Sequence, residues 1–309
     1  MRIGAGMDLN VALGPKSLSN PVGVASGTFG YGSEYEQLID LNCIGALYTK
    51  AVTPLPRQGN DIPRIVETPG GILNSIGLAN VGVERFRAEK LPFLSRLSCA
   101  VIVNVAGSVQ DDYLAVVDAL EEEDAVWGYE INISCPNVKQ GGIAFGTDPA
   151  VVERLTAALR RRTARPLIMK LTPNVSDITV CARAAENGGA DALSCINTLV
   201  GMVIDIEKKR PVLSARTGGL SGPAIRPVGV AMVYRVCRAV SVPVIGIGGI
   251  MTAADALEYL LAGAVAVQVG TATFVDPGCA QEVLAGITSY CRRHALSSVA
   301  QLGSLLEEG

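Results

Sequence analysis

Short apolar runs alternate with longer amphipathic stretches along most of the chain. We predict that the apolar runs are β-strands, at residues 22–25, 46–49, 100–103, 127–135, 167–169, 192–195, 244–247 and 266–269. The stretches between them predict helices at residues 33–41, 83–96, 111–122, 149–162, 177–186, 227–240, 252–262 and 279–293. Apolar strands that alternate with amphipathic helices indicate a parallel sheet that is buried on both faces.

Eight strand–helix units favour a closed (β/α)8 TIM barrel of the α/β class over a doubly wound sheet. Residues 8–18 place two short apolar pieces around Gly14-Pro15 and predict an N-terminal hairpin. Two long segments, 53–80 and 201–223, interrupt the alternation, and we interpret them as functional excursions, the first of them irregular. No linker or low-complexity tract divides the chain, so we expect a single domain over residues 1–309.

Polar side chains gather where the predicted strands end, which is the edge that carries the chemistry in this type of barrel. Reading the strand ends in order gives Ser26, Lys50, Asn104, Asn132 with Cys135, Lys170, and Asn197 with Thr198. A lysine in a barrel interior is costly without an anionic or polar partner. We therefore predict an active site at this edge. The alternatives are solvated loop residues, strand-end caps for the asparagines, and a small buried hydrophobe for Cys135.

Glycines follow the seventh and eighth strands, at Gly248-Gly249 and at Gly270-Thr271. Glycines let backbone N–H groups approach an anion, and the N-terminus of a following helix favours negative charge. This pair of strand ends predicts a phosphate site, although the glycines could also simply make tight turns. A phosphate site does not distinguish flavin mononucleotide (FMN) from a sugar phosphate. The asparagines and Lys170 favour the flavin, whose reduced form carries negative charge near N1.

Composition and charge exclude several other classes of protein. Hydrophobic residues make up 49% of the chain and the net charge is -3, which gives no electrostatic case for nucleic acid. No apolar run is long enough to span a membrane, and no signal peptide is evident, so we expect a cytoplasmic protein. The eight cysteines form no C-x-x-C pair, and His294 is the sole histidine. A metal site or a histidine-dependent triad is therefore not expected.

Several short motifs together resemble one family, the class 1 dihydroorotate dehydrogenases of pyrimidine biosynthesis. The resemblance spans nearly the whole chain and rests on Ser26-Gly-Thr, Thr49-Lys50-Ala51, Asn74-Ser-Ile-Gly-Leu78, Asn132-Ile-Ser-Cys-Pro-Asn137, Lys170-Leu-Thr-Pro-Asn174, Ile196-Asn-Thr198, Gly218-Gly-Leu-Ser-Gly-Pro223, Ile247-Gly-Gly249 and Gly270-Thr271. Within class 1, residues 201–205 and 219–224 resemble the heteromeric B type.

The resemblance implies a role for each matching residue. Cys135 would be the catalytic base that takes the C5 proton of dihydroorotate, while a hydride passes from C6 to FMN. FMN would be held by Ser26, Lys50, Ala51, Asn104, Asn132, Lys170, Ile196, Gly222, Gly248, Gly249, Gly270 and Thr271. The pyrimidine would be held by Lys50, Asn74, Ser75, Ile76, Gly77, Leu78, Asn132, Asn197 and Thr198.

The resemblance also implies a route for the electrons. B-type members pass them to a partner subunit that carries FAD and a [2Fe–2S] cluster, and then to NAD. This sequence has neither the cysteine spacing of a cluster site nor a complete Rossmann fingerprint. We therefore expect one FMN per chain and a heterotetramer with a homodimer at its core. The alternatives are a fumarate-dependent A-type enzyme, a related FMN-dependent dihydropyrimidine dehydrogenase, or a barrel that serves as a non-catalytic scaffold.

Overall fold

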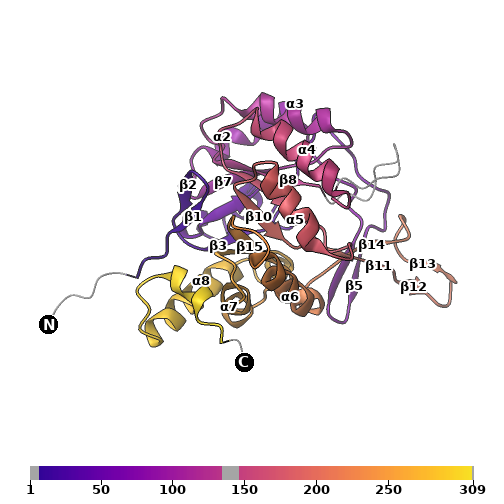
Figure 1. The fold of residues 1–309 in the computed structure, drawn as a ribbon. Helices are drawn as coiled ribbons and strands as arrows, with labels where there is room; N and C mark the ends of the chain where they lie inside the picture. The colour runs from indigo at the N-terminus through magenta and orange to yellow at the C-terminus, as the bar shows by residue number, and fades with distance from the viewer. Residues whose placement is uncertain (1–6, 134–145, 308–309) are drawn as a thin grey trace.

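A closed barrel of eight parallel strands forms the centre of the molecule in the computed structural model, which describes residues 7–133 and 146–307 (Figure 1). Neighbouring strands follow the chain in order, and β16 pairs with β3 to close the ring. The barrel strands are β3 (Val22–Val24), β4 (Ala46–Tyr48), β7 (Ala100–Val105), β8 (Gly128–Asn132), β9 (Leu167–Lys170), β10 (Ala192–Cys195), β15 (Val244–Ile247) and β16 (Ala266–Val269). The prediction of a (β/α)8 barrel is confirmed.

The strands are buried on both sides because helices cover the outside of the ring, as Figure 1 shows for α3 to α8. The helices are α1 (Val83–Glu89), α2 (Leu91–Leu94), α3 (Gln110–Leu120), α4 (Pro149–Arg160), α5 (Ile178–Asn187), α6 (Arg226–Cys237), α7 (Ala253–Leu261) and α8 (Cys279–Arg293). Asp148 and Thr252 cap α4 and α7, since each side chain accepts a hydrogen bond from a backbone N–H in the first turn.

Two helix predictions are wrong in part. Residues 33–41 form no α-helix; instead two short 3-10 turns occur, η1 (Ser33–Tyr35) and η2 (Leu41–Cys43). Asp40 accepts a hydrogen bond from the backbone N–H of Asn42, and such a bond competes with a continuing helix. The helix predicted at 83–96 is divided into α1 and α2 at Lys90. Pro92 lacks the N–H that a continuous helix would need there.

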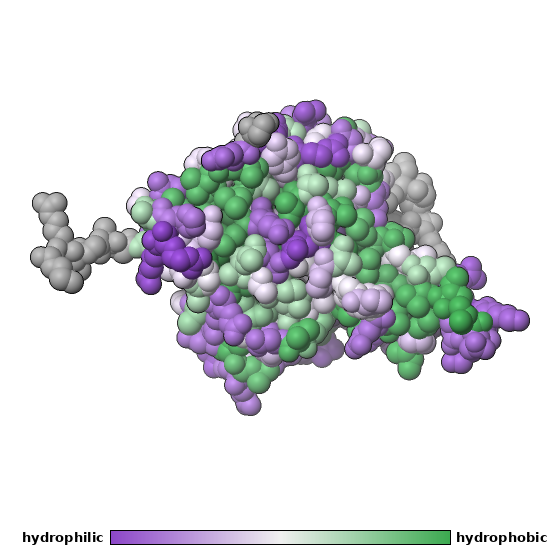
Figure 2. All heavy atoms as spheres, turned by 90° about the horizontal axis from the view of Figure 1, so that it is seen from below, coloured by the Kyte–Doolittle hydropathy of each residue, from purple (hydrophilic) through white to green (hydrophobic). Residues whose placement is uncertain are grey.

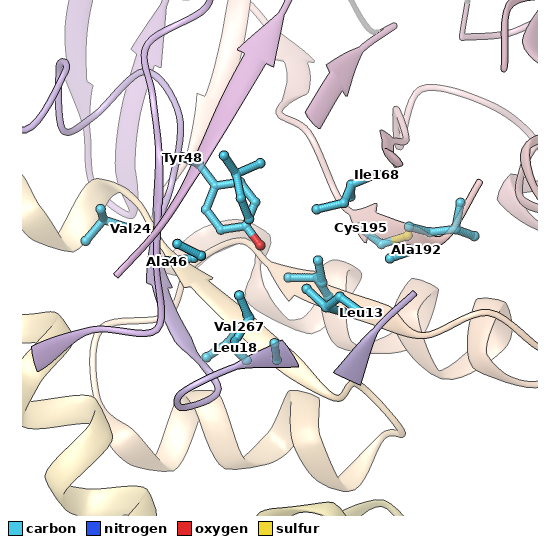
Figure 3. Close-up of a cluster of buried hydrophobic side chains, with 14 of the residues drawn as sticks. Leu13, Leu18, Val24, Ala46, Tyr48, Ile168, Ala192, Cys195 and Val267 are labelled. Atoms are coloured by element: carbon cyan, nitrogen blue, oxygen red, sulfur yellow. The ribbon is translucent and has the colours of Figure 1, made fainter. Parts of the chain in front are cut away.

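The N-terminal hairpin, β1 (Val11–Leu13) and β2 (Lys16–Leu18), is confirmed and covers the end of the barrel where the strands begin. Leu13 and Leu18 are buried there, and Figure 3 shows Leu18 beside Val267 of β16. Lys16 reaches the carbonyl oxygen of Trp127, which directly precedes β8. The hairpin therefore closes the amino-terminal end of the barrel and leaves the carboxyl end for ligands.

The two excursions meet on the other end of the barrel and form a sheet of their own. Its strands, in order across the sheet, are β11 (Leu199–Gly201), β14 (Gly218–Ser221), β6 (Gly71–Asn74) and β5 (Ile65–Thr68). A smaller ribbon follows, β12 (Ile204–Asp205) with β13 (Arg210–Pro211). The prediction that residues 53–80 are irregular is therefore wrong in part, because β6 gains its partner β14 from a distant part of the chain.

Apolar side chains remain exposed on the excursion sheet and its ribbon. Ile65, Val200, Met202 and Ile204 are each about half exposed or more. Figure 2 shows apolar surface on the side of the molecule where Figure 1 places these strands. Among residues 7–133 and 146–307, no helix has the length and apolar character needed to cross a bilayer.

Candidate active site

A cavity of about 490 Å³ opens at the carboxyl ends of the barrel strands, roofed by the excursion sheet. Nearly all of the residues predicted to bind a ligand line this one cavity, although they come from many strands and from both excursions. They are Ser26, Lys50, Ala51, Asn74, Ser75, Ile76, Gly77, Leu78, Asn132, Lys170, Ile196, Asn197, Thr198, Gly248, Gly249, Gly270 and Thr271. The structure thus brings together the predicted cofactor and substrate residues.

Two of the predicted residues that the structure describes, Asn104 and Gly222, do not line the cavity. Asn104 is fully buried below it, inside the barrel. Gly222 lies behind Gly249, so that a Cβ at Gly249 would come within 2.7 Å of the Gly222 carbonyl oxygen. Cys135 belongs to residues 134–145, which lie outside the described residues.

The glycines at the ends of β15 and β16 have the backbone that a phosphate site needs. Gly248 and Gly249 have φ values of 128° and 68°, in the region that favours glycine over other residues. The hydroxyl of Thr271 donates to Ser221 Oγ over 2.9 Å, which joins this corner to the excursion sheet. Sequence reasoning missed Ser221, although it stands directly before Gly222. Exposed amides and small hydroxyls in such a corner suit an anionic group.

Amide side chains form the centre of the cavity wall. Asn197 Nδ2 donates to Asn132 Oδ1 over 3.1 Å, and Asn197 Oδ1 accepts from the backbone N–H of Thr198 over 2.8 Å. Asn174 Nδ2 in turn donates to the Thr198 carbonyl oxygen over 2.9 Å. These bonds fix the orientation of the amides, which can therefore present defined donors and acceptors to a flat heterocycle.

Lys50 is half-buried at the end of β4, and its backbone N–H donates to the carbonyl oxygen of Gly30. Burial lowers the pKa of the Lys50 ammonium, and the neighbouring Arg64 lowers it further, while Glu34 acts in the opposite direction. Two cations near one wall of the cavity attract an anionic ligand. The pocket beside Lys50 is therefore suited to a carboxylate.

Lys170 has the anionic partner that a buried lysine requires. Its Nζ lies 3.4 Å from Oε1 of Glu130, and both side chains are almost completely buried. Glu130 was not among the predicted site residues, and neither were Ser194 and Gln268, which also hydrogen-bond to it. One signal was present in the sequence: Glu130 stands two residues before Asn132, so both side chains lie on the same face of β8.

The residues present fit a flavin mononucleotide. Gly248 and Gly249 offer a cradle that side chains would fill, and Lys170 offers a cation at the cavity wall. Asn104 Oδ1 is buried and has no hydrogen-bond partner in the described part of the chain, so an acceptor is left for a ligand N–H group. A phosphate corner, a row of fixed amides and a buried cation are the elements that FMN needs.

Comparisons with known proteins give one consistent result. Residues 8–290 match the family model described as dihydroorotate dehydrogenase. The chain is 56% identical over 300 residues to the dihydroorotate dehydrogenase B (NAD(+)) catalytic subunit of Pelobacter propionicus, with 97% of this chain and 99% of that protein covered. It is 55% identical over 295 residues to the protein of the same name from Geotalea daltonii, with 96% and 97% covered.

A solved structure has the same fold. The crystal structure of DHODH from Eimeria tenella in complex with ferulenol superposes with a TM-score of 0.78 and covers 96% of this chain and 87% of that one. Its sequence identity is 23%, so the likeness bears on the barrel fold alone.

Proposed function

This chain belongs to the dihydroorotate dehydrogenase family, and from that premise we propose that its cavity oxidises dihydroorotate to orotate in pyrimidine biosynthesis. The chain would act as the catalytic subunit of a B-type, NAD-linked enzyme, as the names of its relatives indicate. The observation that carries the proposal is the convergence of the predicted flavin and pyrimidine residues on a single cavity.

FMN supplies the hydride acceptor for this oxidation when it is bound. The phosphate would lie at the glycines that directly follow β15 and β16, with Gly222 behind Gly249. The ring would meet the amides and Lys170, whose ammonium stabilises negative charge on a reduced flavin. Ser26, Ala51, Ile196 and Thr271, which line the cavity, would supply the remaining contacts.

Cys135 is the proposed base for the C5 proton. Ile133 and Gly146, the described residues on either side of 134–145, both line the cavity, which supports a place for Cys135 near it. A thiolate is a competent general base, since an ordinary cysteine has a pKa of about 8.5. The proton would pass to the thiolate sulfur as the C5–H bond breaks.

An ion pair and several hydrogen bonds would both contribute to the binding of the substrate. The ammonium of Lys50 would attract the carboxylate of dihydroorotate, and residues 74–78 of the first excursion line the same cavity. Asn132, Asn197 and Thr198 would orient the pyrimidine ring and stabilise charge that develops on its carbonyl oxygens. Leu78 holds a left-handed backbone, with φ of 57°, at this wall, and such strain is typical of functional loops.

Electrons would leave through a second polypeptide that carries FAD and a [2Fe–2S] cluster and reduces NAD. The phrase "catalytic subunit" in the names of the relatives supports a partner chain. We place the complex in the cytoplasm, with two catalytic chains as a homodimer core and two partners in a heterotetramer.

The absorbance spectrum of the purified protein is the direct test. We expect a flavin spectrum that bleaches when dihydroorotate is added without oxygen. Dihydrouracil serves as the matched substrate control, because it lacks the carboxylate that Lys50 would bind. A colourless protein that takes up no FMN, or bleaching by dihydrouracil but not by dihydroorotate, contradicts the proposal.

The route of the electrons is tested by the oxidant. NAD should reoxidise the reduced chain only when the partner polypeptide is present, and fumarate should not reoxidise it at all. Rapid reoxidation by fumarate would instead indicate the A-type reaction.

A further inference from the structure

A fully buried carboxylate, Glu130, lies inside the barrel below the cavity. Its Oε1 accepts a hydrogen bond from Asn104 Nδ2 over 2.7 Å and lies 3.4 Å from Lys170 Nζ. Its Oε2 accepts from Ser194 Oγ over 2.9 Å and from Gln268 Nε2 over 2.7 Å. The four partners belong to β7, β9, β10 and β16, so one side chain connects five strands of the ring.

All four partners donate to Glu130, so the group serves as an acceptor only, as an ionised carboxylate does. A charge without exposed surface needs hydrogen bonds and an opposite charge, and Lys170 is the cation among the four partners. The Tyr48 hydroxyl is also affected, because burial raises its pKa well above the ordinary range and the negative charge of Glu130 adds to that shift.

Two of the four partners, Asn104 and Lys170, are residues that we propose to bind the flavin. The bond from Asn104 Nδ2 determines which end of that amide faces Glu130, and therefore leaves Oδ1 as the acceptor for a ligand N–H. Lys170 lies between Glu130 and the cavity, since it contacts the first and lines the second.

We infer that Glu130 is a positioning residue of the flavin site, an inference that rests on the proposed function. It holds the ammonium of Lys170 and the carboxamide of Asn104 in one orientation below the cavity. Its negative charge also offsets the charge of Lys170, so that the pair presents less positive potential to the flavin than a lysine alone would. Glu130 thereby sets how readily the bound flavin accepts electrons.

The test is the midpoint potential of bound FMN, measured by equilibration with a reference dye in the absence of oxygen. In Glu130→Gln the charge of Lys170 is no longer offset, so negative charge on the reduced flavin is stabilised and the potential rises. We expect the reduction equilibrium to shift by about tenfold, which is about 30 mV for a two-electron couple. A potential equal to or below that of the wild type, in a folded variant that holds FMN, overturns the inference.

Asp191→Asn is the matched control. Asp191, like Glu130, is a carboxylate in an ion pair, here with Arg160. It is only partly buried, however, and directly precedes β10 at the opposite end of the barrel. Asp191→Asn changes the net charge by the same amount as Glu130→Gln, and it should leave the midpoint potential of bound FMN unchanged. A rise equal to that of Glu130→Gln would mean that the overall charge, not the position of Glu130, sets the potential.

A second variant decides the question if Glu130→Gln fails to fold or to retain FMN. Ser194→Ala removes one neutral donor from Glu130 and leaves both charges in place. The carboxylate is then less well neutralised, so the potential should fall, in the direction opposite to that of Glu130→Gln. A potential equal to or above the wild-type value overturns the inference. The wild-type spectrum and its bleaching by dihydroorotate test the proposed function separately.

Discussion

At the scale of single residues, Cys135 is the residue that we propose for the proton transfer of the reaction. In Cys135→Ala we expect FMN to remain bound, while its bleaching by dihydroorotate slows by about 10²–10⁴-fold, the usual contribution of a general base. Stopped-flow absorbance at the flavin band measures this rate. Cys181→Ala is a suitable control, because that thiol belongs to α5, is buried and donates to the carbonyl oxygen of Gly146. Bleaching of Cys135→Ala at the wild-type rate would remove Cys135 from the role of base.

Lys50 gives the site a dependence on pH. Its lowered pKa means that the ammonium loses its proton below pH 10.5, the ordinary value for lysine. The attraction for a carboxylate is therefore complete at pH values below the lowered pKa and is lost as the pH rises through it. We expect the dissociation constant of orotate to increase over this window. Spectral titration of FMN-bound Cys135→Ala measures the effect without a contribution from that thiol.

Lys50→Met provides the comparison for this titration. It should bind orotate more weakly at neutral pH and show no further weakening as the pH rises towards 10.5. If the dissociation constant of orotate depends on pH in the same way with Lys50→Met as with Lys50, another group is responsible for that dependence.

At the scale of elements, the turn after β15 determines whether the phosphate corner can form. Gly249 has a φ of 68°, and an added Cβ would lie 2.7 Å from the Gly222 carbonyl oxygen and 2.8 Å from Arg226 Cβ. Gly249→Ala should therefore shift this turn and weaken FMN binding by at least about tenfold, or 1.4 kcal/mol. Quenching of flavin fluorescence on binding measures the affinity.

Gly278→Ala is the control for that substitution. Gly278 has an ordinary φ of -79° before α8, and an added Cβ would meet only the flexible end of Asp276, at 3.3 Å. We expect its FMN affinity to equal that of the wild type. Equal affinities for Gly249→Ala and Gly278→Ala would show that the turn after β15 does not carry the phosphate.

At the scale of the whole molecule, FMN binding should stabilise the barrel, because the cavity proposed to hold it is built from strands across the ring and from both excursions. At a free FMN concentration of about 100 times its dissociation constant, the stabilisation is about 2.7 kcal/mol. An unfolding entropy of about 2.1 cal/mol/K per residue then predicts that FMN removal lowers Tm by about 4 °C. Thermal unfolding followed by circular dichroism measures the change.

Riboflavin is the matched ligand, since it has the ring of FMN without the phosphate. It should raise Tm less than FMN does at the same concentration, because the glycines that follow β15 and β16 then have no anion to bind. An equal rise in Tm with FMN and with riboflavin would show that the phosphate makes no stabilising contact with the protein.

The sequence by itself determined the eight strands of the barrel and most of the helices between them. Apolar runs such as 244–247 become strands because burial on both faces excludes polar residues, and this requirement is local. Because the strands are parallel, their carboxyl ends meet at one edge, so Lys50, Asn132 and Lys170 could be predicted to share a site. Helix limits were less certain where a local competitor such as Asp40 or Pro92 intervened.

Only the tertiary structure decided which distant residues became partners. Glu130 meets Lys170 and Gln268 across 40 and 138 residues of chain, because β9 pairs with β8 and the closed ring puts β16 across the barrel interior from β8. Asn74 likewise faces Gly219 only because the two excursions pair as β6 and β14. No periodicity or local motif in the sequence predicts these contacts. They depend on how the strands pair and in which register, not on residues that are neighbours in the chain.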